Sequence, residues 1–125
     1  MTRSPVKESA INFLTLVASG NIHSAYQQYV GPGFRHHNPH FRGDAESLRA
    51  AMEENTKMSP GKILEIKQAL QDGDRVVTFS WIRQQPEEIG WAVVHIFRFE
   101  HGKIVELWDV GQAIPAESPN ENGMF

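Results

Sequence analysis

The stretch GWAVVHIFRFEHGKIVELWDVGQ, residues 90–112, decides the fold of this chain. Its two halves are rich in β-branched and aromatic residues, and the polar residues between them are typical of a turn. We therefore predict an antiparallel hairpin with a three-residue loop at Glu100, His101 and Gly102. In that register Phe99 lies opposite Lys103.

Strand alternation divides the hairpin into two faces. One face is apolar except for a histidine and an aspartate, and it carries Trp91, Val93, His95, Phe97, Phe99, Val105, Leu107 and Asp109. The other face carries Ala92, Val94, Ile96, Arg98, Ile104, Glu106 and Trp108, and its opposite charges suit a solvated outer surface. We predict that the first face is interior. A two-residue loop would shift the register by one and would separate His95 from Asp109.

A carboxylate on an apolar face requires an explanation, because burying a charge without a partner is unfavourable. A desolvated carboxylate is one way in which proteins make a general base that works near neutral pH. In the alternative interpretation, Asp109 terminates a strand and bonds to the backbone or to a histidine. The pattern of residues leaves both interpretations open.

A second group of polar residues lies in GFRHHNPHFRGD, residues 33–44. His36 and His37 are adjacent, so in an extended chain they point to opposite sides, and the sequence does not tell which one faces inward. A bend at Pro39 could bring His37 and His40 together, but the spacing matches no metal-binding pattern and we predict no metal site. The remaining interpretations are a catalytic loop, with Asn38 as an amide donor, and an ordinary polar turn.

The rest of the chain predicts an α+β layout, with helices first and about four antiparallel strands after them. Ser4 as N-cap, Pro5 and Gly20 delimit a first helix, Asn21 begins a second that ends at GPG, and Asp44 begins a third that ends before SPG. The runs KILEIKQAL and RVVTFSWIRQ predict two strands before the hairpin. The tail from about residue 115 to 125 is either disordered or docked through its apolar end.

Composition limits the class of protein. The chain has 125 residues, a net charge of −3 and no cysteine, which fits a single domain spanning residues 1–125. The absence of a basic stripe argues against a nucleic-acid partner, and the absence of cysteine excludes disulfides and thiolate nucleophiles. No apolar run approaches the ~20 residues that span a bilayer, and the N-terminus lacks a signal-peptide core. We therefore predict a cytoplasmic protein.

Three segments together resemble the SnoaL-like polyketide cyclase group of the nuclear transport factor 2-like superfamily, whose members are often described as predicted aldol-condensation-catalysing enzymes. They are YVGPGFRHHNPHFRGD, GWAVVHIFRFEHGKIVELWDVGQAIP and the terminal NENGMF. The resemblance runs from about residue 8 to the C-terminus. It implies a cone-shaped barrel in which a curved antiparallel sheet and N-terminal helices enclose an apolar pocket.

The resemblance also implies a site. An acid–base carboxylate on the last long strand matches Asp109, and the histidine of the HNP element matches His37. The chain departs from the group at His95, where an acidic residue is the more common expectation. We therefore expect Asp109, His37 and His95 to be catalytic. Ligand contacts are expected from Asn38, His40, Trp91, Val93, Phe97, Leu107, Tyr26 and Trp81.

The leading functional hypothesis is a cofactor-independent cyclase or isomerase, in which Asp109 removes a proton next to a carbonyl group and polar donors hold the enolate. The alternative is a non-catalytic module that binds a small apolar ligand. Epoxide hydrolysis ranks lower, because the nearest arginine, Arg98, is expected to face outward. Relatives also imply a homodimer through the outer sheet face, where Val94, Ile96 and Trp108 would form an apolar patch.

Overall fold

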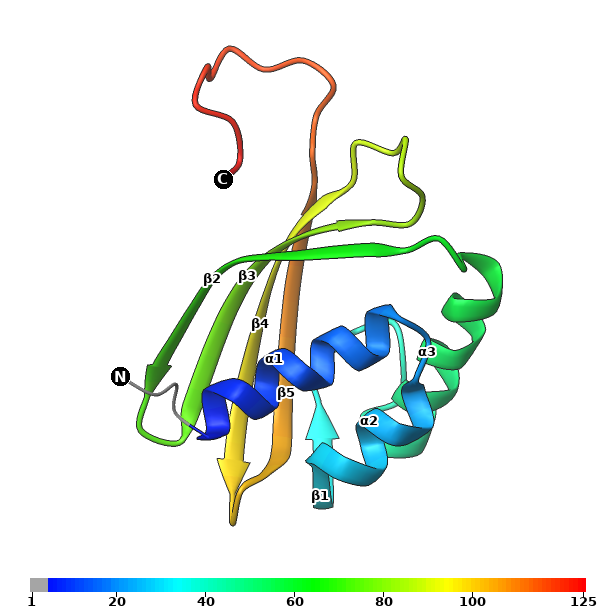
Figure 1. Ribbon diagram of the computed structural model, residues 1–125, viewed down its shortest axis with the longest axis vertical. Coiled ribbons are helices and arrows are strands. Elements are labelled where there is room, and N and C mark those ends of the chain that lie inside the picture. The colour runs from blue at the N-terminus through cyan, green and yellow to red at the C-terminus, as the bar shows by residue number, and fades with distance from the viewer. Residues whose placement is uncertain (1–4) are drawn as a thin grey trace.

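The computed structural model describes residues 5–125, which form three helices packed against one strongly curved sheet (Figure 1). The elements in chain order are α1 (Pro5–Ala18), α2 (Ile22–Tyr29), β1 (Val30–His36), α3 (Ala45–Met58), β2 (Ile63–Asp72), β3 (Arg75–Arg83), β4 (Trp91–Glu100) and β5 (Lys103–Ala113). The strand order is β1-β5-β4-β3-β2. The predicted α+β class is confirmed.

The helices begin and end close to the residues that the sequence predicts. α1 begins at Pro5, while its predicted cap Ser4 lies outside the described residues. Gly20, with φ +88°, ends this segment in the left-handed region that favours glycine. Asp44 caps α3, because its carboxylate accepts a hydrogen bond from the backbone N–H of Ser47 at 2.9 Å.

The first strand was not predicted. β1 runs parallel to β5 at one edge of the sheet, with Arg35 opposite Glu106 and His36 opposite Leu107. The GPG sequence bends the strand rather than ending it, because the register shifts between Val30 and Arg35 and Gly33 takes φ +75°. The strand therefore continues beyond this bend and carries the HHNPH segment to the sheet.

The hairpin loop is shorter than predicted, but the assignment of faces remains almost intact. His101 and Gly102 both have positive φ, which gives a two-residue turn with Glu100 paired to Lys103 and Phe99 to Ile104. A bulge before Glu106 then restores the alternation, so that Arg98 pairs with Glu106 and His95 with Asp109. Ile104 is the exception: it lies on the turn side of the bulge and is fully buried in the core instead of on the outer face.

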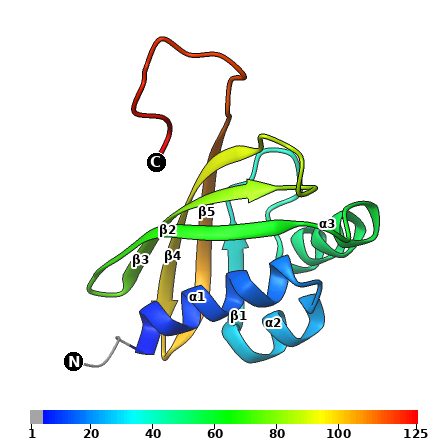
Figure 2. The same cartoon turned by 45° about the horizontal axis from the view of Figure 1, so that its top comes forward.

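The helices cover the concave face of the sheet (Figures 1 and 2). Ala10, Phe13 and Leu14 of α1 are buried, and the Phe13 ring packs edge-on against that of Phe97 with centroids 6.2 Å apart. This contact joins α1 to β4 in the core. None of the helices in the described part of the chain has the length and apolarity that a membrane crossing requires.

The C-terminal tail extends beyond the sheet and then turns back towards it (Figure 1). The Phe125 ring contacts those of Phe79 and Trp81 on the outer face, with centroids 5.2 and 6.0 Å apart. Of the two interpretations of the tail, docking through its apolar end is therefore confirmed.

Candidate functional site

Two adjoining cavities lie between the helices and the concave face of the sheet. The outer one, of about 340 Å³, opens between α3 and strands β3, β4 and β5, and the inner one, of about 120 Å³, lies against α1. Five residues line both cavities: Met52, Lys62, Ile82, His95 and Asp109. A third hollow of about 360 Å³ lies between the α1–α2 turn and α3. It is lined by solvent-facing residues such as His23 and Lys57 and, among the described residues, by no buried unpaired polar atom comparable to Nδ1 of His95 in the other two.

A row of polar residues crosses the concave face at the level of these cavities. Thr78 pairs with His95, and His95 pairs with Asp109, so the three side chains share one face on neighbouring strands. Oγ1 of Thr78 and Nδ1 of His95 are buried and have no hydrogen-bond partner among the described residues. Buried polar atoms without partners reduce stability. The fold therefore tolerates an unfavourable polar row at the cavity, as is common at functional sites.

Asn38 holds the Asp109 carboxylate in place. The Asn38 amide nitrogen donates to Oδ2 of Asp109 at 3.1 Å, while its amide oxygen accepts from the backbone N–H of His40 at 2.9 Å. This second bond fixes the orientation of the amide, because only an oxygen can accept from N–H. Oδ1 of Asp109 has no hydrogen-bond partner in the described part of the chain, so it remains available to a ligand.

His95 is held neutral by its surroundings. Removal from bulk water lowers the pKa of His95 to about 4; the charge of Asp109 opposes this change and the charge of Lys62 reinforces it. A neutral imidazole has one N–H donor and one acceptor nitrogen. Near neutral pH Asp109 therefore lies opposite an uncharged imidazole.

Lys62 is a site residue that the sequence reasoning missed. It lies between the end of α3 and the start of β2, and it lines both cavities. Strand alternation contains a signal for it, because Lys62 precedes Leu64 and Ile66, which pack against the core from the same side. Burial lowers its pKa.

His37, which was expected to be catalytic, lines neither cavity, so the structure does not bring it together with Asp109. Its ring stacks on Trp108 at 4.9 Å, and its Nε2 lies 2.6 Å from Oε2 of Glu106 on the outer face. His36 faces inward instead, since the parallel pairing of β1 with β5 decides the side. Its Nε2 donates to the carbonyl of Arg42 and its Nδ1 accepts from the N–H of Asn38, so the ring orders the loop that carries Asn38.

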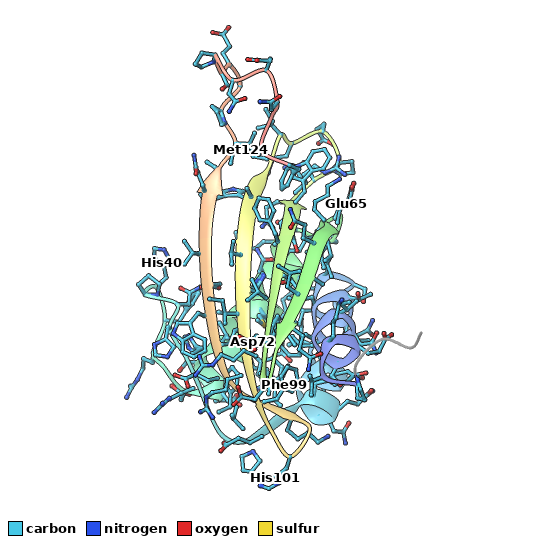
Figure 3. All side chains as sticks on the ribbon, turned by 90° about the vertical axis from the view of Figure 1, so that its left-hand side faces the viewer. His40, Glu65, Asp72, Phe99, His101 and Met124 are labelled. Carbon is cyan, nitrogen blue, oxygen red and sulfur yellow. The ribbon has the colours of Figure 1, made fainter. Side chains whose placement is uncertain are left out.

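The other predicted ligand contacts divide into two groups. Asn38, Trp91 and Val93 line the outer cavity and Leu107 lines the inner one. Trp81 lies on the outer face, where its indole N–H donates to the carbonyl of Ile89. The remaining predicted contacts do not line either cavity: Phe97 is fully buried, His40 points outward at the edge of the molecule (Figure 3), and Tyr26 is packed behind Met52, with its hydroxyl 3.3 Å from the Met52 sulfur.

Trp81 and His40 were misassigned for reasons that lie outside their local sequence. Trp81 pairs with Ala92, and this register places its ring on the convex side. His40 follows the turn at Asn38 and Pro39, which directs it away from the sheet. Residues 5–125 hold no group of three or more His, Cys, Asp or Glu side chains that could bind a metal ion.

Comparison with known proteins agrees with this architecture. The SnoaL-like domain family matches residues 10–107. A SnoaL-like protein of unknown function from Burkholderia thailandensis superimposes with a TM-score of 0.75 at 15% identity, covering 90% of this chain and 98% of that one. No curated protein matches the sequence.

Two further structures share the fold. A putative polyketide cyclase from Bacillus cereus superimposes with a TM-score of 0.73 at 22% identity, covering 86% of this chain and 74% of that one. AclR, a putative hydroxylase from Streptomyces galilaeus, gives 0.71 at 23% identity and covers 86% and 88%. At these identities the likeness extends to the fold, and different activities are named among its members.

Proposed function

We propose that this chain, which belongs to the SnoaL-like domain family, is a cofactor-independent enzyme that enolises a small carbonyl compound, as an isomerase or an aldol-type cyclase does. The observation that carries the proposal is the Asp109 carboxylate, bonded to Asn38 and opposite His95 inside a cavity with largely apolar walls. A carboxylate in this setting is suited to accept a proton from carbon.

Each group has a distinct part in the proposed step. Asp109 removes the proton from the carbon next to the carbonyl group, and the electron pair moves to the carbonyl oxygen. The neutral His95 ring donates a hydrogen bond to that oxygen. Protonated Asp109 then returns the proton, either to another carbon in an isomerisation or to the new alkoxide in an aldol reaction.

The apolar walls of the cavity supply orientation for a ligand. Phe41, Leu48, Ile82, Trp91 and Val93 surround the outer cavity, which suits the apolar body of a small ligand. Arg98 faces outward and pairs with Glu106 at 3.0 Å. An epoxide hydrolase that needs an arginine between two acids therefore finds no support at Asp109.

The test is hydrogen–deuterium exchange at the α-carbon of a small cyclic ketone, followed by NMR in D₂O. We expect the protein to accelerate exchange, and Asp109→Asn to slow it by about 10²–10⁴-fold, the usual contribution of a general base. Asp72→Asn, at the exposed end of β2, is the matched control and should exchange the ketone at the original rate.

Two results would contradict the proposal. Asp109→Asn could retain full exchange, which would remove Asp109 from the chemistry. Alternatively, the protein could bind the ketone, as seen by quenching of the tryptophan fluorescence to which Trp91 at the cavity contributes, without accelerating exchange. The second result would support a binding module instead, an alternative that the apolar lining favours.

A further inference from the structure

Lys62 is placed at the cavity by a short turn. The backbone N–H of Lys62 donates to the carbonyl of Ser59 at 3.2 Å, directly after α3 ends at Met58. Because Leu64 pairs with Ile82, which also lines both cavities, the alternation along β2 directs Lys62 to the same side. Lys62 therefore enters the cavity from the β2 edge of the sheet, three strands away from β5, which carries Asp109.

The charge of Lys62 has no carboxylate partner among the described residues. Lys67, which faces the outer side, pairs with Glu65 at 3.1 Å, whereas Lys62 and Asp109 line the same two cavities without forming an ion pair. The positive charge of Lys62 nevertheless lowers the pKa of His95, so the ammonium group lies within electrostatic reach of that ring. The two opposite charges thus face a common space from different walls.

We propose that Lys62 is the counter-ion for the ligand oxygen, and that the ligand is an apolar 1,3-dicarbonyl compound that becomes an enolate in the cavity. This inference rests on the proposed function, since it concerns the same site. It adds a catalytic residue and a substrate class.

The movement of charge favours a 1,3-dicarbonyl over a carboxylic acid. A carboxylate ligand would bring a permanent second anion next to Asp109 in a poorly solvated space, which is unfavourable. A 1,3-dicarbonyl compound enters uncharged. When Asp109 takes the proton from the carbon between the carbonyl groups, the electron pair of that C–H bond moves to an oxygen, and the negative charge passes from Asp109 to the oxygen beside Lys62. The net charge of the cavity does not change.

The cavities also limit the size of the ligand. Together they hold a compact molecule, since the outer one is about 340 Å³ and the inner one about 120 Å³. In both cavities, aliphatic and aromatic side chains surround Lys62 and Asp109. A suitable probe is therefore 1-phenyl-1,3-butanedione, which has one apolar ring and absorbs differently as enol and as enolate.

The experiment measures the ratio of enolate to enol of this bound probe by ultraviolet absorbance across pH. Because an opposite charge within about 4–6 Å lowers the pKa of an acid by 1–3 units, we expect the bound ratio to exceed that in water by at least about tenfold. Lys62→Met should bring the ratio to its value in water or below, because Asp109 and the apolar walls both disfavour a second anion. Lys62→Arg should retain most of the increase, and Lys57→Met, an exposed change on α3, should leave it unaltered.

Asp109→Asn separates this inference from the proposed function. The ratio is an equilibrium property, so it should persist or rise when the neighbouring anion is removed, even though the rate of proton exchange falls. An unchanged exchange rate with a Lys62-dependent ratio would refute the base and retain the counter-ion. Folding of each variant is checked by its urea unfolding curve, and Lys62→Arg keeps the test valid if the methionine variant is unstable.

Two outcomes would overturn the inference. In the first, Lys62→Met, folded and able to bind the probe, retains the raised enolate ratio. In the second, mass spectrometry finds the probe attached to Lys62 with loss of water, which would mean that the amine reacts with the carbonyl carbon instead of pairing with the oxygen.

Discussion

Each face of β5 carries a carboxylate, but the outer carboxylate has several hydrogen-bond partners and the inner one has a single partner. On the outer face, the Glu106 carboxylate accepts from Arg35 and Arg98 at 3.0 Å each, and contacts Nε2 of His37 at 2.6 Å. On the inner face, three residues further along, Asp109 has one donor, Asn38. In the outer cluster both carboxylate oxygens have protein partners, whereas in the inner cluster Oδ1 of Asp109 can still accept a hydrogen bond from a ligand.

The outer cluster is structural in character. Burial alone would raise the pKa of Glu106, but the hydrogen bonds from His37, Arg35 and Arg98 outweigh it and lower the pKa to about 2. Since Arg35 and His37 come from the edge strand and its extension, these bonds attach β1 to β5. The difference teaches that residue type does not identify a site: an acid beside a histidine is found on both faces, and incomplete pairing inside a cavity distinguishes the functional candidate.

The largest expected effect on stability is that of Glu106→Gln. It leaves two arginines without their carboxylate, and we expect it to reduce the free energy of unfolding by about 1–3 kcal/mol. Asp109→Asn, the matched change on the inner face, should alter it by less than about 1 kcal/mol. Urea unfolding monitored by circular dichroism measures both. Equal losses would remove the distinction between the two clusters.

The second prediction concerns pH. The pKa of His95 is near 4 in the folded protein, against 6.5 for an unperturbed histidine, so the unfolded chain binds this proton first as pH falls. His95 therefore contributes stability fully above pH 6.5, and this contribution should be lost progressively as pH falls from 6.5 towards 4. Glu106, with its lowered pKa, contributes above pH 4.5 and loses this contribution between pH 4.5 and about 2.

The two pH windows are separable by measurement. His95→Gln should flatten the dependence of unfolding free energy on pH between 6.5 and 4.5, whereas the exposed His40→Gln should not. The ring protons of His95 should titrate by NMR with a midpoint near pH 4. A titration midpoint close to pH 6.5 would mean that water reaches His95 and that the inner cluster is solvated.

The smallest expected effect comes from a matched pair of phenylalanines, one for each face. Phe41 lines the outer cavity and Phe125 docks on the convex side, and each has 45% of its surface exposed. We expect Phe125→Ala to cost about 0.5 kcal/mol of stability through its lost ring contacts without changing ligand binding. Phe41→Ala should weaken binding of the diketone probe and leave stability nearly unchanged. The reverse pattern would place the ligand on the convex face.

Much of the fold was predictable from local patterns. The helix boundaries at Pro5, Gly20 and Asp44 follow from capping and glycine preferences. The predicted pairing of His95 with Asp109 was correct only because two deviations from the prediction cancelled. The hairpin loop was assigned one residue too many, and the bulge before Glu106 compensated. Face assignment was therefore correct for His95 and Asp109 and wrong for Ile104, which lies between the turn and the bulge.

The site was predictable only in part. The HHNPH segment gave no means of choosing between His36 and His37, because that choice depends on how β1 pairs with β5, about 70 residues later in the chain. Lys62 was missed because a lysine after a proline–glycine turn is ordinarily exposed. It becomes a site residue only because the turn after α3 and the start of β2 place it against the two cavities.

The sequence by itself determined that Asp109 and His95 share the concave face, since the alternation of side chains along a strand is a property of the extended backbone. Only the tertiary structure decided which charges meet them. Asn38, Lys62 and Asp109 come from three separate segments, and their convergence depends on long-range strand pairing and helix packing, which no local pattern encodes.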